Sequence, residues 1–79
     1  MNQEKIGKFI AQRRKDKKLT QAKLASYLGI SDRTISKWER GKGLPDPMYM
    51  LELCQILDIS VNELLTGEFI EERNYQQKA

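Results

Sequence analysis

Between positions 32 and 37, four side chains that can form hydrogen bonds or carry charge would fall on the outward face of a helix. Asp32 offers carboxylate acceptors, Arg33 and Lys37 offer cationic donors, and Ser36 offers a hydroxyl that can do both. Residues four apart lie on the same side of an α-helix, so Arg33 and Lys37 would face one ligand if this stretch is helical. An arginine fork can donate two parallel hydrogen bonds to neighbouring acceptors. These side chains therefore suit a ligand that presents negative charge and rows of acceptors.

A helix over about residues 31–40 would position these side chains. Ser31 is a favourable N-cap, and Gly41 follows where the helix can end. Ile35 and Trp38 lie three apart and form an inward apolar stripe. Trp38 could be considered as a base-stacking residue, but its place on that stripe predicts that it packs in the core.

A second short helix precedes this one. Thr20 can cap it, Leu24 and Leu28 fall on one face together with Ala25, and Gly29 suits its end. Two such helices joined by a short glycine-containing turn form the helix-turn-helix unit, whose second helix enters the major groove of DNA. Arginine can there bind O6 and N7 of guanine, and a carboxylate can accept from cytosine N4. We therefore expect base-reading residues at Asp32, Arg33, Ser36 and Lys37.

The role of Asp32 stays open at this stage. It can accept a hydrogen bond from a base, or it can only favour the dipole at the first turn of its helix. Ser36 is short and could touch a base or a thymine methyl group. For all of these residues the alternative is a solvated helix face.

Basic residues are concentrated in the first half of the chain. Residues 1–42 hold twelve Lys and Arg and four Asp and Glu, a net charge of +8, whereas residues 43–79 have a net charge of −5. The positive half is the half that contains the helix-turn-helix pattern. This coincidence of charge and motif indicates a surface that faces nucleic acid.

The chain resembles the Cro and phage-repressor class of helix-turn-helix proteins, the Xre-like family, over roughly residues 3–67. The resemblance implies an all-α fold, a compact five-helix bundle of the lambda-repressor-like type. We expect the helices at about 3–17, 21–28, 31–40, 47–57 and 60–67. The residues that carry the resemblance are Thr20-Gln21, Leu24-Ala25, Gly29-Ile30-Ser31, Ile35, Trp38-Glu39, Gly41, Ile59-Ser60-Val61 and Glu63-Leu64-Leu65.

The helix at 47–57 has a clear beginning. Asp46 is expected to cap it and Pro47 to be its first residue. A capping box from Ser60 to Glu63 is expected to begin the last helix. The residues expected to face inward from the helix at 47–57 are Met50, Leu51, Cys54 and Leu57. The run Met48–Met50 is open to two interpretations, as core or as a partner surface.

The resemblance implies further site roles. Arg14, late in the first helix, and Glu39, near the end of the third, stand where relatives have an ion pair that fixes these helices together. Other matching positions contact phosphates, which sets register and affinity without reading sequence. Arg40 and Lys42 stand at such positions. Gln21, which heads its helix where backbone amides favour a phosphate, and Thr34 are also expected to be phosphate-positioning residues.

These observations predict sequence-specific binding of double-stranded DNA by a transcriptional regulator, a repressor that blocks promoter access. One short recognition helix covers few base pairs, so a homodimer on an inverted-repeat operator is expected. Two alternatives stay open. One is an antitoxin-type protein-binding module that also regulates its own operon, and the other is the DNA-reading head of a longer regulator.

Several classes of function are not expected. The chain has no histidine and one cysteine, Cys54, so it offers no intrachain disulfide and no zinc cluster. It has no nucleophile with a base and no phosphate-binding glycine loop, which predicts neither an enzyme nor a cofactor. Cys54 is expected to be a small core residue rather than a redox sensor. Without an apolar run near ~18 residues or a secretory leader, a cytoplasmic location and no membrane partner are expected.

The predicted domain covers residues 1–67, and residues 68–79 form a C-terminal tail. Phe69, Ile70 and Tyr75 are scattered there among polar residues. We expect an extra helical turn that fades into a disordered end, or else the start of a linker. Within this tail, the stretch from Phe69 to Tyr75 is the only feature that would serve the antitoxin-type alternative.

Overall fold

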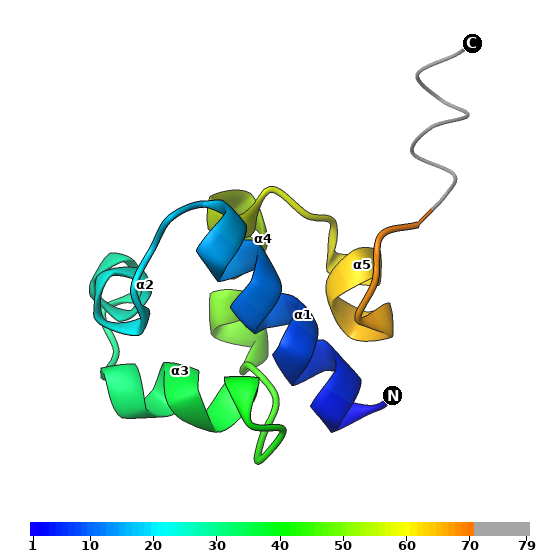
Figure 1. Ribbon diagram of the computed structural model, residues 1–79, viewed down its shortest axis with the longest axis horizontal. Coiled ribbons are helices and arrows are strands. Elements are labelled where there is room, and N and C mark those ends of the chain that lie inside the picture. The colour runs from blue at the N-terminus through cyan, green and yellow to red at the C-terminus, as the bar shows by residue number, and fades with distance from the viewer. Residues whose placement is uncertain (71–79) are drawn as a thin grey trace, which may run out of the picture.

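The computed structural model describes residues 1–70, and this part of the chain consists of five α-helices (Figure 1). They are α1 (Gln3–Asp16), α2 (Gln21–Leu28), α3 (Asp32–Glu39), α4 (Pro47–Leu57) and α5 (Val61–Thr66). The expected all-α five-helix fold is therefore confirmed. None of these helices has the length and apolar character needed to cross a bilayer.

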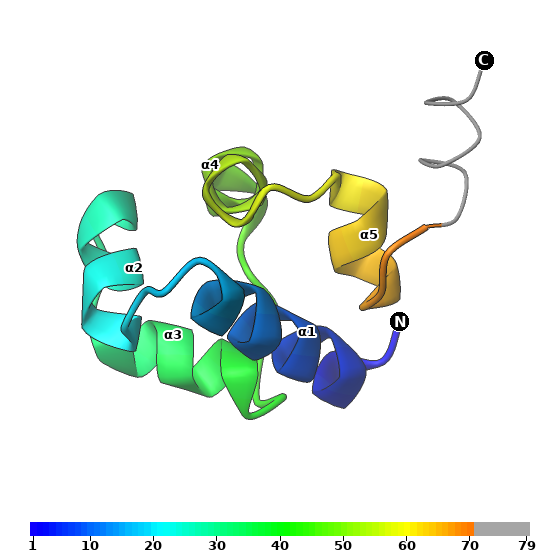
Figure 2. The ribbon, with the colours of Figure 1, turned by 45° about the horizontal axis from the view of Figure 1, so that its top comes forward.

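The first helix organises the bundle. α1 packs against α3, α4 and α5, and α2 packs against α3 and α4. Both views place α2 and α5 at opposite ends of the bundle with α1 between them (Figures 1 and 2). The orientation of α3 is thus set by two helices, α1 and α2.

The helix ends follow from short-range hydrogen bonds that the sequence predicts. The hydroxyls of Thr20 and Ser31 each accept a hydrogen bond from a backbone amide in the first turn of their helix, at 3.0 and 3.3 Å. Ser60 and Glu63 form the expected capping box, with donor–acceptor distances of 2.8 and 3.0 Å. Gly29 ends α2 with a φ of 69°, a left-handed conformation that glycine adopts without steric cost.

Apolar side chains from all five helices form one core. Trp38 is only 5% exposed and belongs to this core, as expected from its position on the inward stripe. Removing these side chains from water supplies the main favourable term in folding. The buried apolar residues are Ile6, Ile10, Leu24, Ala25, Leu28, Ile35, Trp38, Leu53, Cys54, Leu57, Ile59 and Leu64.

The crossing of α1 and α3 depends on Gly7. A Cβ atom at this position would lie 2.4 Å from the carbonyl oxygen of Trp38 and 2.7 Å from that of Glu39. Those distances are far inside van der Waals contact and involve backbone atoms, which cannot move aside as a flexible side chain can. The lack of a side chain at Gly7 therefore allows α1 to lie directly on the last turn of α3.

One expectation for the inward face of α4 is wrong. Leu51 is 64% exposed, whereas Leu53 is fully buried beside Cys54 and Leu57. Leu51 precedes Leu57 by six residues, which places it about 120° away around the helix. Leu53 precedes Leu57 by four and shares its face. The inward stripe of α4 is therefore centred on Leu53, Cys54 and Leu57.

Two helix ends also differ from the expected ones. Asp46 occupies the N-cap position of α4, with Pro47 as the first residue, but the Asp46 side chain makes no capping hydrogen bond. α1 ends at Asp16, and Lys17 is its C-cap. The following residue, Lys18, has a φ of 59°, which turns the chain sharply out of the helix.

The predicted extra helical turn after residue 67 is absent from the described part of the tail. Gly67 ends α5 with a φ of 74°, and residues 68–70 are not helical. Phe69 instead packs its ring edge-to-face on Phe9, with 5.4 Å between ring centroids, and the Arg13 guanidinium lies 4.9 Å from the Phe69 centroid. The rest of the predicted tail, including Tyr75, lies outside the described residues.

Candidate nucleic-acid interface

One side of α3 is buried in the core and the opposite side is exposed. Ile35 and Trp38 are 0% and 5% exposed, so they hold α3 in the core. The opposite side presents Asp32, Arg33 and Lys37 as exposed side chains. Arg33 and Lys37, the two positively charged residues among the predicted base readers, therefore lie on the accessible side of α3.

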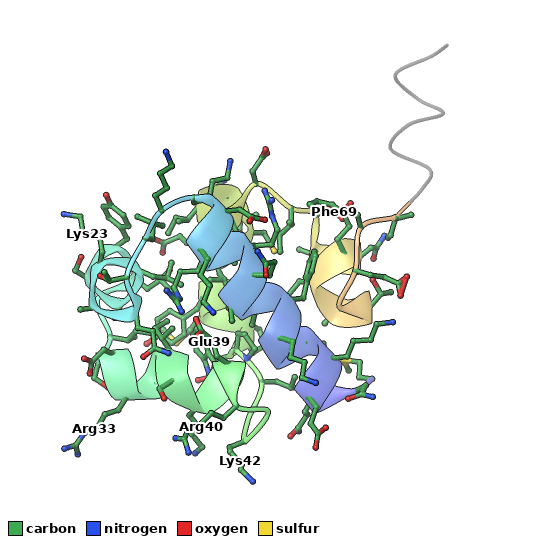
Figure 3. The ribbon with its side chains drawn as sticks, in the orientation of Figure 1. Lys23, Arg33, Glu39, Arg40, Lys42 and Phe69 are labelled. Atoms are coloured by element: carbon green, nitrogen blue, oxygen red, sulfur yellow. The ribbon has the colours of Figure 1, made fainter. Side chains whose placement is uncertain are left out.

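Three exposed basic residues of α3 and of the turn after it point the same way. Figure 3 shows Arg33, Arg40 and Lys42 extending from one side of the molecule, whereas Glu39 points inward and Lys23 points elsewhere. Within residues 1–70, Arg33, Lys37, Arg40 and Lys42 make no ion pair, since the pairs of this part involve other basic residues. This side of α3 therefore has uncompensated positive charge.

The first turn of α3 holds Thr34 in place. The Thr34 hydroxyl lies 3.2 Å from that of Ser31, and the Thr34 amide donates to the Ser31 hydroxyl. Thr34 is half-buried, and Asp32 lies exposed in the same turn. A carboxylate there favours the helix dipole whether or not it also accepts from a base.

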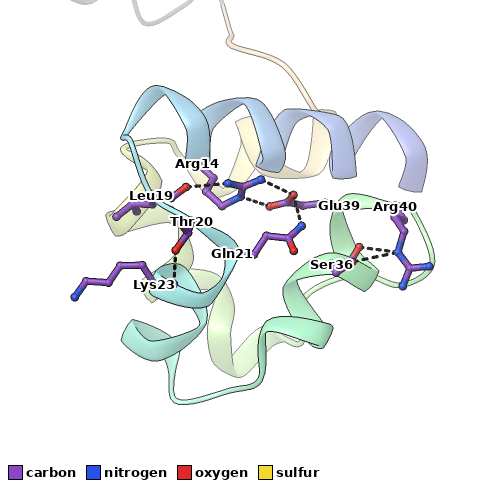
Figure 4. Close-up of polar contacts among 8 residues, drawn as sticks. All are labelled: Arg14, Leu19, Thr20, Gln21, Lys23, Ser36, Glu39 and Arg40. Carbon is purple, nitrogen blue, oxygen red and sulfur yellow. Dashed lines mark hydrogen bonds and ion pairs between the residues drawn. The ribbon is translucent and has the colours of Figure 1, made fainter.

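Ser36 and Arg40 are bonded to each other one turn apart along α3. The Arg40 Nε donates to the Ser36 hydroxyl at 3.2 Å and to the Ser36 carbonyl oxygen at 3.3 Å (Figure 4). Ser36 is half-buried and Arg40 is exposed. The predicted reader Ser36 and the predicted phosphate contact Arg40 therefore form one unit.

Lys37 and Lys42 lie where α3 leads into the next loop. The Lys42 amide donates to the Lys37 carbonyl oxygen at 3.0 Å. A Cβ atom added at Gly43 would lie 3.5 Å from the Lys37 Cε atom, so the Lys37 stem runs along this loop. Both ammonium groups stay on exposed side chains.

The pair of Arg14 and Glu39 that the family resemblance implies is present. The Arg14 Nε donates to Glu39 Oε2 at 2.6 Å and its Nη2 donates to Glu39 Oε1 at 3.0 Å (Figure 4). The side chains of Arg14 and Glu39 are 11% and 7% exposed. The hydrogen bond to Glu39 raises the pKa of Arg14 above its ordinary value, against the effect of burial.

Two further contacts extend this pair to the helix-turn-helix unit. The Arg14 Nη1 donates to the Leu19 carbonyl oxygen at 2.8 Å, and the Gln21 Nε2 donates to Glu39 Oε1 at 3.0 Å. Gln21 is the first residue of α2, so the network joins α1, the start of α2 and the end of α3. An amide NH₂ has two donors, and one of them in Gln21 still has no partner in this network.

Sequence reasoning missed the role of Arg13. Its Nε and Nη2 donate to the Leu57 carbonyl oxygen at 3.2 and 2.9 Å, and its Nη1 pairs with Asp16 at 3.2 Å. Arg13 thus caps the C-terminus of α4 rather than facing a ligand. The available signal is its spacing, because Arg13 follows Ile10 by three and shares the inward side of α1.

Glu63 was also missed as a buried group, although its capping role was expected. Its side chain is 0% exposed, and its Oε2 accepts from the Ile70 amide at 3.1 Å while its Oε1 accepts from Ser60. Burial raises the pKa of the nearby Cys54 thiol, and the Glu63 charge raises it further. A thiol with a raised pKa is a poor nucleophile, which is consistent with Cys54 as a core residue.

A match to a family profile shows which family the chain belongs to. The helix-turn-helix family profile matches residues 10–64. The chain belongs to the helix-turn-helix family. The resemblance to the Cro and phage-repressor class is therefore confirmed, and the matched segment contains α2, α3 and the Arg14–Glu39 pair.

Two much longer curated relatives share the helix-turn-helix segment. The chain is 41% identical over 59 residues to the HTH-type transcriptional activator BcrR of Enterococcus faecalis, covering 75% of this chain and 29% of BcrR. It is 38% identical over 68 residues to Repressor protein C2 of Salmonella phage P22, covering 86% of this chain and 32% of the repressor. The chain thus spans about a third of the length of either relative.

Solved structures share the whole arrangement of helices. The P22 c2 repressor in complex with a synthetic operator has a TM-score of 0.75 and 38% identity, over 80% of this chain and 96% of that one. The restriction-modification controller protein C.AhdI from Aeromonas hydrophila has a TM-score of 0.71 and 30% identity, over 80% of this chain and 91% of that one. The fold is therefore shared, over most of this chain, with a repressor and with a restriction-modification controller protein.

Proposed function

We propose that this chain binds double-stranded DNA in the major groove through α3 and represses transcription by occupying promoter DNA. The observation that carries the proposal is the two-sided character of α3. Its apolar side is held in the core, while basic residues of α3 and the next turn are exposed together without an ion pair in the described structure. A polyanionic duplex supplies the missing negative charge.

The exposed side chains divide into two roles. Arg33 and Lys37 are the proposed readers of base edges, with Asp32 beside them at the N-terminal end of the recognition helix, where base contacts concentrate. The proposed phosphate contacts are Gln21, Thr34, Arg40 and Lys42. Arg14 and Glu39 support both sets by holding α3 against α1.

Known relatives favour repression. The P22 protein is named a repressor, and its solved structure contains an operator. BcrR is named an activator, so the family fold serves either sign of regulation. Repression needs only occupancy of a promoter, which α3 can achieve without a further surface. We also propose that the chain is not an enzyme and that it acts in the cytoplasm.

We also propose that the chain binds as a homodimer on an inverted repeat. One recognition helix reads few base pairs, and two-fold-related copies read two half-sites about one turn apart. Met48 and Leu51 are 73% and 64% exposed and lie three apart on α4. A second copy of the chain is the proposed cover for this apolar face.

The greater length of the curated relatives favours a second candidate, the DNA-reading head of a longer regulator. In both candidates α3 is the reading element. Detection of the protein in its own cells with an antibody against residues 1–70 would separate them by the size of the band.

Selection of bound duplexes from a random DNA pool tests the proposed function. We expect enrichment of an inverted repeat whose two half-sites are about one helical turn apart. Placing the enriched sequence over a promoter should then lower reporter expression when the protein is present. A pool with no enriched sequence, at a salt concentration where related domains bind, would contradict DNA binding.

A further inference from the structure

We propose that Ser36 is a positioning residue that orients Arg40 on the DNA-facing surface and does not itself read a base. This inference rests on the proposed binding of DNA through α3. It changes the role that the sequence alone predicts for Ser36, which was expected to be a reader.

The contact between the two side chains is the starting point. The Arg40 Nε is shared between the Ser36 hydroxyl at 3.2 Å and the Ser36 carbonyl oxygen at 3.3 Å. Figure 4 shows the Arg40 side chain turned back along α3 toward Ser36. Ser36 is half-buried between the buried Ile35 and the exposed Lys37, so the side chain that carries this hydroxyl lies at the border between the packed and the exposed sides of α3.

This contact leaves the outer edge of the guanidinium free. The two terminal NH₂ groups of Arg40 carry four N–H donors, and in the described structure none of them has a protein acceptor. Arg40 extends on the same side as Arg33 and Lys42 (Figure 3). Holding Nε therefore directs the other donors outward, toward the position of a phosphate.

The physical benefit is preorganisation. A free arginine side chain samples many rotamers and loses that freedom when it binds, and a guanidinium already held by an acceptor loses less. Because a phosphate contact carries no sequence information, the benefit should be the same for every operator sequence. A base contact by Ser36 would instead act at one position of the half-site.

A double-mutant cycle on DNA binding tests the proposal. The proteins are the parent, Ser36→Ala, Arg40→Ala and the double variant, titrated by fluorescence anisotropy against the selected operator and against single-base variants of it. We expect Ser36→Ala to weaken binding about threefold to tenfold on every duplex. In the Arg40→Ala background the same substitution should change nothing.

Two matched variants separate positioning from general structure. Ser36→Thr keeps a hydroxyl at the same place and should retain most of the affinity. Ser26→Ala removes a hydroxyl on α2 that donates to the Lys23 carbonyl oxygen and does not contact an arginine, so it should leave affinity unchanged. Alanine is a better helix former than serine, so Ser36→Ala should remain folded, and thermal unfolding checks this.

Three results would overturn the proposal. The first is a loss confined to one base-pair position, which identifies Ser36 as a reader. The second is a loss of equal size in the Arg40→Ala background, and the third is no loss in Ser36→Ala. Failure of the proposed function itself looks different, because the parent protein would then bind no duplex and Arg33→Ala would change nothing.

Discussion

The Glu39 side chain joins the end of α3 to both α1 and α2. Its two carboxylate oxygens accept two hydrogen bonds from Arg14 and one from Gln21, and its side chain is 7% exposed. A carboxylate with three donors around it cannot be replaced by an amide without turning an NH₂ group toward one of those donors. The negative charge of Glu39 therefore contributes to the stability of the fold.

We expect Glu39→Gln to lower the free energy of unfolding by on the order of 3 kcal/mol, because it leaves the Arg14 charge buried without its partner. Arg14→Met combined with Glu39→Met should recover part of this loss. Recovery should be incomplete, because Leu19 and Gln21 also lose their partners. Denaturant unfolding of the parent, the single variants and the double variant measures the coupling, and additive single effects would show that the pair is not coupled.

Arg33 and Arg40 have the same side chain but different proposed roles, since Arg33 is proposed to read a base and Arg40 to contact a phosphate. Arg33→Ala should relax base preference at one position of each half-site and cost about 1–3 kcal/mol on the preferred operator. Arg40→Ala should weaken all duplexes alike. Titration against a panel of single-base operator variants measures both, and identical profiles for the two variants would refute the division of roles.

At the scale of the elements, the crossing of α1 and α3 leaves no room for a larger side chain at Gly7. Gly7 brings α1 onto the carbonyl groups of Trp38 and Glu39. In an exposed helix, replacing glycine by alanine stabilises by about 1 kcal/mol. At this crossing the added methyl must push two helices apart, and overpacking typically costs about 1–3 kcal/mol.

Gly7→Ala should therefore lower the melting temperature and also weaken DNA binding, because the end of α3 is displaced. Gln12→Ala, on the exposed side of the same helix, is the control and should leave both nearly unchanged. Thermal unfolding measures the stability of the two variants, and a titration with operator DNA measures their affinity. A higher melting temperature for Gly7→Ala would show that α1 and α3 are less closely packed than the described geometry requires.

At the scale of the whole molecule, internal contacts reduce the number of basic residues that can face DNA. Arg13 and Arg14 are bonded to backbone and carboxylate groups inside the bundle, and Lys5 and Lys17 pair with Glu68 and Asp58. The exposed basic residues of α3 and the following turn are not used in this way, since none of them forms an ion pair in the described structure.

Affinity should accordingly depend strongly on salt. If the two basic residues among the proposed phosphate contacts, Arg40 and Lys42, neutralise one phosphate each, log K against log salt should fall with a slope of about −2 for each protomer. Lys42→Ala should reduce the steepness by about one. Titrations from low to moderate salt measure this, and a flat response would contradict binding through phosphates.

The proposed homodimer also concerns the whole molecule. Leu51→Asp should place a charge on the apolar face of α4 and prevent a second copy from covering it. We expect weaker binding to the full inverted repeat and unchanged binding to a duplex that carries one half-site, which serves as the control. Equal binding of parent and variant to the full repeat would show that the dimer, if formed, uses another face.

Much of the fold and part of the site could be predicted from local sequence. N-caps at Thr20 and Ser31, the Ser60–Glu63 capping box and the inward Ile35 and Trp38 each depend on residues within a few positions of one another. Their physical causes are a side-chain oxygen bonded to a nearby amide and a 3.6-residue period. The sequence by itself therefore determined where α3 begins and which side of it faces the core.

Only the tertiary structure decided how the helices meet. Three features depend on the distance and angle between helices. They are the close approach of α1 and α3 at Gly7, the capping of α4 by Arg13, and the burial of Leu53 instead of Leu51. Periodicity does not specify these quantities, because two neighbouring stripes on one helix satisfy the same pattern. The contact of Arg40 with Ser36 depends in addition on a choice of rotamer. Packing therefore decided which of the many charged side chains hold the bundle together and which remain free for a ligand.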